Sequence, residues 1–96
     1  MPASSKERKH VNRAVEYIGI GDKSRALRHL KRGLEKRGFG QDSKTIEELN
    51  SKINTLLTEH LENDEKIDAI FDPFCVLMAI PSFTFRNGVK RMQAKV

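Results

Sequence analysis

The sequence predicts an all-α protein, a small bundle of three to four helices followed by a basic C-terminal tail. Three stretches carry apolar residues at spacings of three and four, as the buried face of a helix does. Glycine or Asp/Asn signals separate these stretches, which is typical of helix ends. The chain has 96 residues, 38% of them hydrophobic, which suits one domain with a small core. We therefore expect a single domain over 1–96, with 1–5 flexible and 82–96 as the segment that could form a separate tail.

The first two predicted helices form a pair. Ser5 is the expected cap of the first, which runs to residues 18–20 and buries Val11, Ala14, Val15 and Ile18. Gly19 to Asp22 breaks the pattern, and Asp22 or Ser24 is expected to cap the second helix, residues 23–37. Gly38 then supplies a left-handed stop.

The second predicted helix has two chemically distinct faces. At 100° per residue, one strip about 100° wide is almost entirely basic, and the opposite side is apolar. Only Glu35 contributes an acid to this helix. The basic strip contains Arg25, Arg28, His29, Arg32 and Lys36.

A third helix is expected to begin at a capping box of Thr45 and Glu48 and to end near Glu62. Its stripe of Ile46, Leu49, Ile53 and Leu56 spans under three heptads, which favours packing on the first two helices over a long coiled coil.

Asn63-Asp64 restarts the chain into a short fourth helix, and Asp72-Pro73 then predicts a new helix start. Residues 74–80 are apolar on every side, so periodicity alone leaves helix and strand open. A segment of this kind needs cover on all sides, and we expect part of it from a second copy of the chain. The predicted dimer interface is Phe74, Val76, Leu77, Met78 and Ile80.

The tail leaves two interpretations open. Asn87-Gly88 between short alternating segments is typical of a β-hairpin, whereas Asn87 as a cap predicts a last helix with Val89, Met92 and Val96 on its buried stripe. In either form the segment after Pro73 contains four Lys or Arg and no acid: Arg86, Lys90, Arg91 and Lys95.

Charge is segregated along the chain. Residues 1–40 contain eleven Lys or Arg and four Asp or Glu, for a net charge of +7. Residues 41–72 contain three and nine, for −6, and residues 73–96 contain four and none, for +4. This order predicts a dipolar surface with one side able to attract a polyanion.

The segment AVEYIGIGDKSRALRHLKRGLEKRG, residues 14–38, resembles one tetratricopeptide repeat. Ala14 and Tyr17 match the small and aromatic positions of the first helix, Gly21-Asp22 the turn, and Ala26 the small residue where the helices cross. The resemblance implies a helical hairpin over 8–37. The departures are His10, Arg13, Leu30, Gly33 and Gly38. No second copy follows, and such repeats need about three copies to stack, so no peptide-binding groove is implied.

The sequence contains no catalytic constellation. The three histidines, His10, His29 and His60, have no metal-ligand spacing, and Cys75 lies in an apolar run where a thiol usually packs. The Gly19-Ile20-Gly21 turn lacks the lysine and hydroxyl of a phosphate-binding loop. We therefore expect no enzyme activity, no cofactor and no metal site.

The function that remains is binding of a polyanion. An arginine-rich strip with few neighbouring acids predicts nucleic-acid binding, with a shape-directed RNA or DNA duplex favoured and a solvated face as the alternative. A module that docks an acidic or helical protein is the second hypothesis, and an anionic-membrane adaptor is weaker because no Trp or Phe flanks the charges. The candidate nucleic-acid residues are Lys6, Lys9, Arg13, Arg25, Arg28, His29, Arg32, Lys36, Arg86, Lys90 and Arg91.

The location expected from the sequence is intracellular, either cytoplasmic or nuclear. The N-terminus has no apolar signal region, and the longest apolar run, residues 74–80, is far shorter than the roughly 20 residues of a membrane span.

Overall fold

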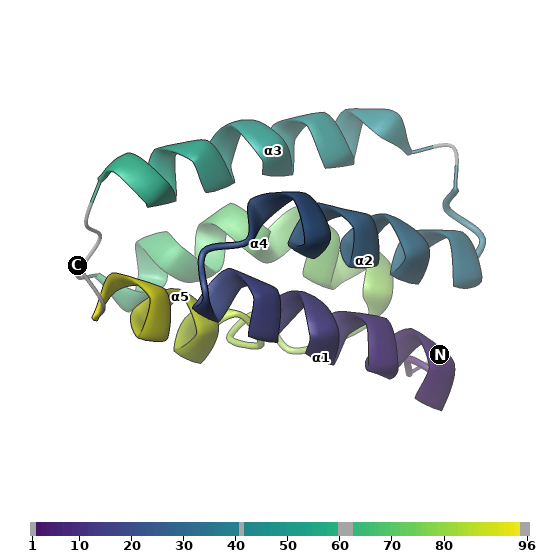
Figure 1. Cartoon of the computed structure of the whole chain (residues 1–96). Helices are drawn as coiled ribbons and strands as arrows, with labels where there is room; N and C mark the ends of the chain where they lie inside the picture. The colour runs from purple at the N-terminus through teal and green to yellow at the C-terminus, as the bar shows by residue number, and fades with distance from the viewer. Residues whose placement is uncertain (1, 41, 60–62, 95–96) are drawn as a thin grey trace.

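The computed structural model describes residues 2–40, 42–59 and 63–94, and within these residues it contains five α-helices and no strand (Figure 1). The helices are α1 (Ser5–Gly19), α2 (Lys23–Lys36), α3 (Ser43–Thr58), α4 (Asp64–Met78) and α5 (Arg86–Gln93). The predicted all-α class is confirmed. The predicted number of three to four helices was too low, because the tail forms a helix of its own.

The helices surround a common core in chain order. Helices α1 and α2 form an antiparallel hairpin over the segment where a helical hairpin was expected, α3 packs on α2, and α4 packs on both (Figure 1). Helix α5 lies against both α4 and α1, so it closes the ring. The largest fully buried side chains are Phe71, Phe74, Phe85, Leu30, Leu34, Leu49, Ile53, Ile67, Met78, Val89 and Cys75.

Helix α1 begins one residue earlier than predicted, because Ser4 and not Ser5 is its cap. The Ser4 hydroxyl accepts from the Glu7 backbone N–H, and the Glu7 carboxylate accepts from the Ser4 N–H at 2.8 Å. This reciprocal pair is a capping box, which satisfies two N–H groups that a helix start otherwise leaves unbonded. The preceding Ala3 is buried.

The turn into α2 and the exit from it follow the predicted signals. Asp22 caps α2, as one of the two expected candidates, and its carboxylate accepts from the Arg25 N–H at 3.1 Å. Gly21 has φ 80° and Gly38 has φ 95°, a region that glycine enters without steric cost. The predicted left-handed stop at Gly38 is therefore confirmed.

The boundaries of α3 differ from the prediction. Asp42 caps this helix and its carboxylate accepts from the Thr45 N–H, so Thr45 lies in the first turn instead of serving as the cap. The helix ends at Thr58, and the predicted end at Glu62 lies outside the described residues.

The two helical segments predicted on either side of Asp72-Pro73 are one continuous helix, α4. Proline has no N–H, so Pro73 cannot bond the carbonyl of residue 69. Ala69 is exposed, and water can satisfy that carbonyl there. The helix ends at Met78, and the residue that caps it, Ala79, adopts φ 54°.

The apolar segment of α4 is mostly covered by this chain's own helices. Phe74 and Met78 are fully buried and Leu77 and Ile80 are partly buried, whereas Val76 is 71% exposed. The chain's own helices therefore supply most of the cover that this segment needs, and Val76 is its exposed member. Burial raises the pKa of the enclosed Cys75 thiol to about 12, with smaller contributions from Asp72 and Asp68.

The tail is a helix and not a hairpin. Helix α5 begins after Phe85, which supplies no side-chain cap, so the expected cap at Asn87 was wrong. Val89 and Met92 lie on the buried stripe as expected, and Val96 lies outside the described residues. Gly88 allows α5 to approach α1 closely: a Cβ at this position would lie 2.9 Å from the Val15 carbonyl oxygen.

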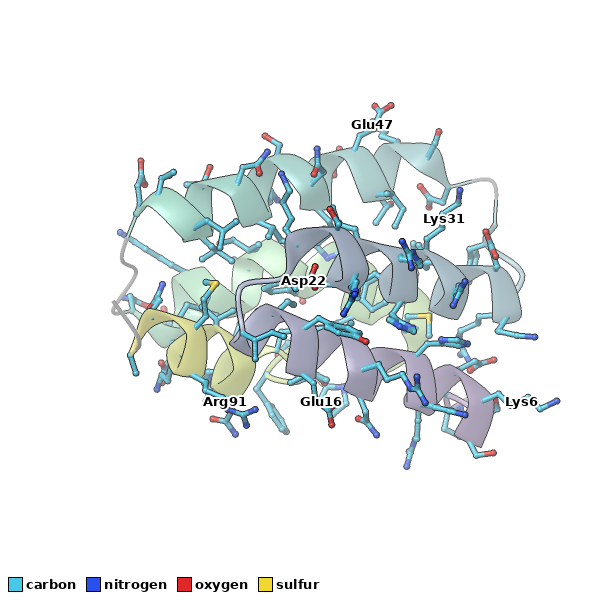
Figure 2. All side chains as sticks on the ribbon, in the orientation of Figure 1. Lys6, Glu16, Asp22, Lys31, Glu47 and Arg91 are labelled. Atoms are coloured by element: carbon cyan, nitrogen blue, oxygen red, sulfur yellow. The ribbon has the colours of Figure 1, made fainter. Side chains whose placement is uncertain are left out.

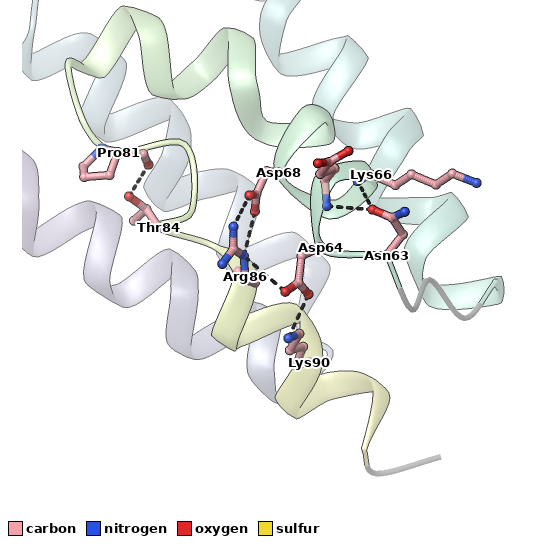
Figure 3. A network of polar contacts seen from close by, with 9 residues as sticks. Asn63, Asp64, Lys66, Asp68, Pro81, Thr84, Arg86 and Lys90 are labelled. Carbon is pink, nitrogen blue, oxygen red and sulfur yellow. Dashed lines mark hydrogen bonds and ion pairs between the residues drawn. The ribbon is translucent and has the colours of Figure 1, made fainter.

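Two basic residues of the tail, Arg86 and Lys90, form ion pairs with α4 (Figure 3). Arg86 forms a two-pronged contact with the Asp68 carboxylate and lies 4.0 Å from Asp64. Lys90 Nζ lies 2.8 Å from Asp64 Oδ1. The acidic start of α4 therefore neutralises much of the charge on α5. Among the described residues, no helix combines the length and apolar character needed to cross a membrane.

Candidate nucleic-acid interface

Basic side chains from α1 and α2 converge on one cleft of about 410 Å³ between the two helices. Figure 2 shows Lys6 at the end of α1 that lies beside the end of α2. No carboxylate is among the lining residues, which are Lys6, Lys9, His10, Arg13, His29, Arg32 and Lys36. We refer to this set as the basic cleft.

The cleft follows from helical spacing on both walls. On α1 its residues occur at 6, 9, 10 and 13, and on α2 at 29, 32 and 36. Spacings of three, four and seven place side chains on one face of a helix. The apolar stripes beside them include Ala14 and Ala26, both fully buried, and small residues of this kind let the helix axes approach. The two basic faces therefore meet along one seam.

Two histidines, one from each helix, contact each other across this seam. His10 Nδ1 lies 3.1 Å from His29 Nδ1, and their ring centroids are 5.4 Å apart. The His29 ring also stacks on Tyr17, with centroids 5.5 Å apart, and the Arg25 guanidinium lies 5.7 Å from the Tyr17 ring centroid. His29, a member of the basic strip, is only 7% exposed and lines the cleft from a mostly buried position.

Both imidazoles favour the neutral form. Burial lowers the pKa of His10, and the nearby cations Arg32, Lys36, Lys9 and Arg13 lower it further. Burial also lowers the pKa of His29, followed by His10, Arg32, Arg13 and Arg28. Every charged neighbour with a resolved effect on either ring is therefore basic. The residues that line the cleft include five Lys and Arg and no Asp or Glu.

This electrostatic setting disfavours a metal ion at the histidine pair. Two imidazole nitrogens 3.1 Å apart resemble two ligands of one ion, but a zinc site in a protein has three or four protein ligands. The described residues contain no group of three or more His, Cys, Asp or Glu that could hold a metal. The surrounding Lys and Arg would repel a cation and attract an anion.

The remaining predicted site residues lie outside the cleft. The Arg25 guanidinium lies 3.5 Å from the Asp22 carboxylate and over the Tyr17 ring. Arg28, next to His29 in the sequence, is exposed. Arg86 and Lys90 are occupied by α4. Arg91 lies close to Gly19 at the far end of α1, and Figure 2 places it toward the other end of the molecule from Lys6.

Sequence reasoning missed one cleft residue, His10. It follows Lys6 by four positions and precedes Arg13 by three, a spacing that places it on the same face of α1. The spacing was available in the sequence. The partnership with His29 was not, because it depends on the register of two helices.

Arg37, just beyond α2, secures the helix ends that frame the cleft. Its guanidinium contacts the Glu7 carboxylate at 3.1 Å and donates to the Leu77 carbonyl at 3.0 Å and the Pro2 carbonyl at 3.3 Å. The Ser4 backbone N–H lowers the pKa of Glu7, and Arg37 lowers it further against the opposing effect of burial. One side chain therefore joins the start of α1 to the ends of α2 and α4.

Comparison with known protein families, with curated proteins and with solved structures finds no match to this chain.

Proposed function

We propose that this protein binds nucleic acid without catalysis and holds a duplex by its phosphate backbone at the basic cleft. The observation that carries the proposal is the convergence of five Lys and Arg side chains from two helices on one concave surface without a lining acid. Like charges placed this close repel one another, and a bound polyanion removes that repulsion.

The chemistry of the cleft favours phosphates over bases. Arginine and lysine contact phosphate oxygens, and such contacts set position without reading sequence. The residues that line the cleft include neither Asn nor Gln, the side chains that read adenine in pairs of hydrogen bonds. The neighbouring aromatic ring, Tyr17, is packed between His29 and Arg25, which leaves it unsuited to stacking on a splayed base. Recognition of duplex shape fits this set better than recognition of a single strand.

A gel-shift series with double-stranded RNA, double-stranded DNA and single strands at several salt concentrations tests the proposal. The key variant is Arg32→Gln/Lys36→Gln, which removes two cations from one wall of the cleft. A matched control, Lys44→Gln/Lys66→Gln, removes two exposed cations from α3 and α4 and leaves the cleft intact. We expect the cleft variant to lose about tenfold or more in duplex affinity at low salt, and the control to change about twofold.

Absence of a salt-sensitive shift with every nucleic acid would reject the proposal. The alternative function, a module that docks an acidic or helical protein, would then be favoured, because the same positive cleft complements an acidic surface. Nucleic acid would compete with such a protein partner only if both bound in the cleft.

A homodimer is the second part of this proposal, and the exposed face of α4 is the surface that supports it. Val76 is the exposed member of the predicted interface, and Leu77 and Ile80 flank it with partly buried side chains. Light scattering of the wild type and Val76→Glu tests this part. A monomeric wild type would reject the dimer and leave the cleft proposal unaffected.

A further inference from the structure

We propose that the His10–His29 pair and the cations around it form a proton-linked site for one phosphate group, and that the pair takes up one proton when the phosphate binds. This inference deepens the proposed function, on which it rests for the source of the phosphate. It gives the two histidines a role in recognising phosphate, and it makes the affinity of the cleft for phosphate depend on pH.

The hydrogen bond between the rings limits the pair to a single added proton. At 3.1 Å one Nδ1 must donate and the other must accept. The donor ring can accept a proton on its second nitrogen while the bond persists, and the bond then becomes charge-assisted. A second proton would place two N–H groups against each other, which would separate the rings. The geometry therefore permits one positive charge on the pair and opposes two.

In the free protein that charge is suppressed by the surroundings. Lys9 and Arg13 on α1, with Arg28, Arg32 and Lys36 on α2, are the Lys and Arg residues that act on one ring or the other. Tyr17 stacks on His29 from α1, the Met78 methyl from α4 lies close to Gly33, and the charged groups that act on either ring are all basic. Glu7, the acid nearest in sequence, is bound by Arg37.

A phosphate bound in the cleft favours the protonated form of the histidine pair. An anion within about 4–6 Å of an imidazole favours the protonated form, and it also cancels the repulsion from the flanking Lys and Arg. The protonated ring then offers an additional N–H to a phosphate oxygen. Because bound phosphate favours the proton, the proton must favour bound phosphate by the same factor.

The direction of the pH effect follows. The free pair is neutral near pH 7.5, so binding there requires proton uptake and is weaker. As pH falls, affinity for phosphate rises by at most about tenfold per pH unit, the limit for one proton. Salt-dependent contacts of Lys and Arg do not vary over this range, because these groups remain charged.

The phosphate has two chemical sources, an internal phosphodiester or a terminal phosphate. Both supply the oxygens that the cleft recognises. Two duplexes that differ only in a 5′-phosphate separate them: equal affinity indicates the backbone, and a preference for the phosphorylated duplex indicates the end.

The test measures duplex affinity by fluorescence anisotropy at pH 7.5, 6.5 and 5.5 and at constant ionic strength, with a 5′-hydroxyl and a 5′-phosphate duplex. We expect wild-type affinity for the 5′-hydroxyl duplex to rise by about threefold to tenfold per pH unit over part of this range. His10→Gln, which keeps His29 as the one titratable ring of the cleft, should bind with a similar salt dependence and a smaller pH dependence. His60→Gln, which removes the third histidine and keeps the pair, should behave as wild type.

A second measurement on the wild type avoids any effect of substitution on folding. NMR titration of the imidazole resonances with and without sodium sulfate, an anion whose charge is constant in this range, should show one midpoint of the pair rising when sulfate is present. Salt-sensitive duplex binding without pH dependence, and with midpoints unmoved by sulfate, would overturn this inference and leave the proposed function intact. A sulfate-dependent midpoint without binding to either duplex would support the anion site and overturn the proposed function.

Discussion

His10 Nδ1 lies 3.1 Å from His29 Nδ1 across the seam between α1 and α2, so two titratable rings share one hydrogen bond inside a basic cleft. The contact is both structural and electrostatic. It joins the two helices whose apolar stripes supply much of the core, and it places imidazoles where the surrounding charges keep them neutral. Stability and binding should therefore respond to pH in opposite directions.

Without a ligand, the folded protein should lose stability as pH falls. The pKa of each ring is lower in the folded chain than the ordinary value of about 6.5, so the unfolded chain binds more protons. Their contribution to stability is present above pH 6.5 and is lost as pH falls toward the folded values. Urea unfolding at pH 7.5 and 5.5 should show a lower midpoint at pH 5.5. We expect the urea midpoint of His10→Gln to decrease less between these two pH values than that of the wild type. An equal decrease would contradict the assignment of this pH dependence to the histidine pair.

Gly88→Ala should destabilise the protein by about 1–3 kcal/mol, because overpacking a close contact forces a backbone shift. The added Cβ would lie 2.9 Å from the Val15 carbonyl oxygen, which belongs to the backbone of α1 and cannot rotate away. Gly33→Ala is a suitable comparison, since its Cβ would lie 3.3 Å from the flexible end of Met78. In thermal unfolding, Gly88→Ala should have a clearly lower midpoint temperature than Gly33→Ala. The reverse order would show that α5 does not pack on α1 in this way.

Arg37→Gln should lower the unfolding midpoint more than Lys31→Gln, although each removes one positive charge. The Arg37 side chain is 15% exposed and its loss leaves the Glu7 carboxylate, 10% exposed, without its ion pair. Lys31 is an exposed residue of α2. Because Arg37 lowers the pKa of Glu7, that contribution is present at neutral pH and disappears as pH falls through the folded value. Urea titrations at pH 7 and 3.5 should show the difference between the variants shrinking at the lower pH.

Asp68→Asn should loosen α5 without unfolding the bundle. Arg86 would lose its two-pronged carboxylate contact and retain Asp64 at 4.0 Å. Asp72→Asn, on the same helix at an exposed position, is the matched control. Hydrogen exchange followed by mass spectrometry should show faster exchange in residues 86–93 for Asp68→Asn only, with α2 unchanged. Uniform acceleration in every helix would instead indicate a global loss of stability.

Local signals in the sequence were sufficient to predict most of the helices. Apolar spacing identified the buried faces of α1, α2 and α3, and glycine and aspartate identified the turn at Gly21-Asp22 and the stop at Gly38. Pro73 was misleading because proline is common at a helix start, whereas here the helix continues through it and Ala69, whose carbonyl it leaves unbonded, is an exposed residue.

Contacts between distant residues could not be predicted in the same way. The pairing of Arg86 with Asp68 and the contact of Phe85 with Phe74 depend on how the segment at the start of α5 folds back, which no local pattern specifies. The cleft was partly predictable, since the basic faces of α1 and α2 follow from spacing. The contact between His10 and His29 required the register between those helices.

The dependence of duplex affinity on salt tests the central claim, that the basic cleft binds a phosphate backbone, most directly. Five phosphate contacts predict that log K falls with log salt at a slope of about −4 to −5, and removing two should reduce its magnitude by about 2. We expect this change for Arg32→Gln/Lys36→Gln and an unchanged slope for Lys44→Gln/Lys66→Gln. Equal slopes for both variants and the wild type, or no binding to any duplex, would contradict the claim.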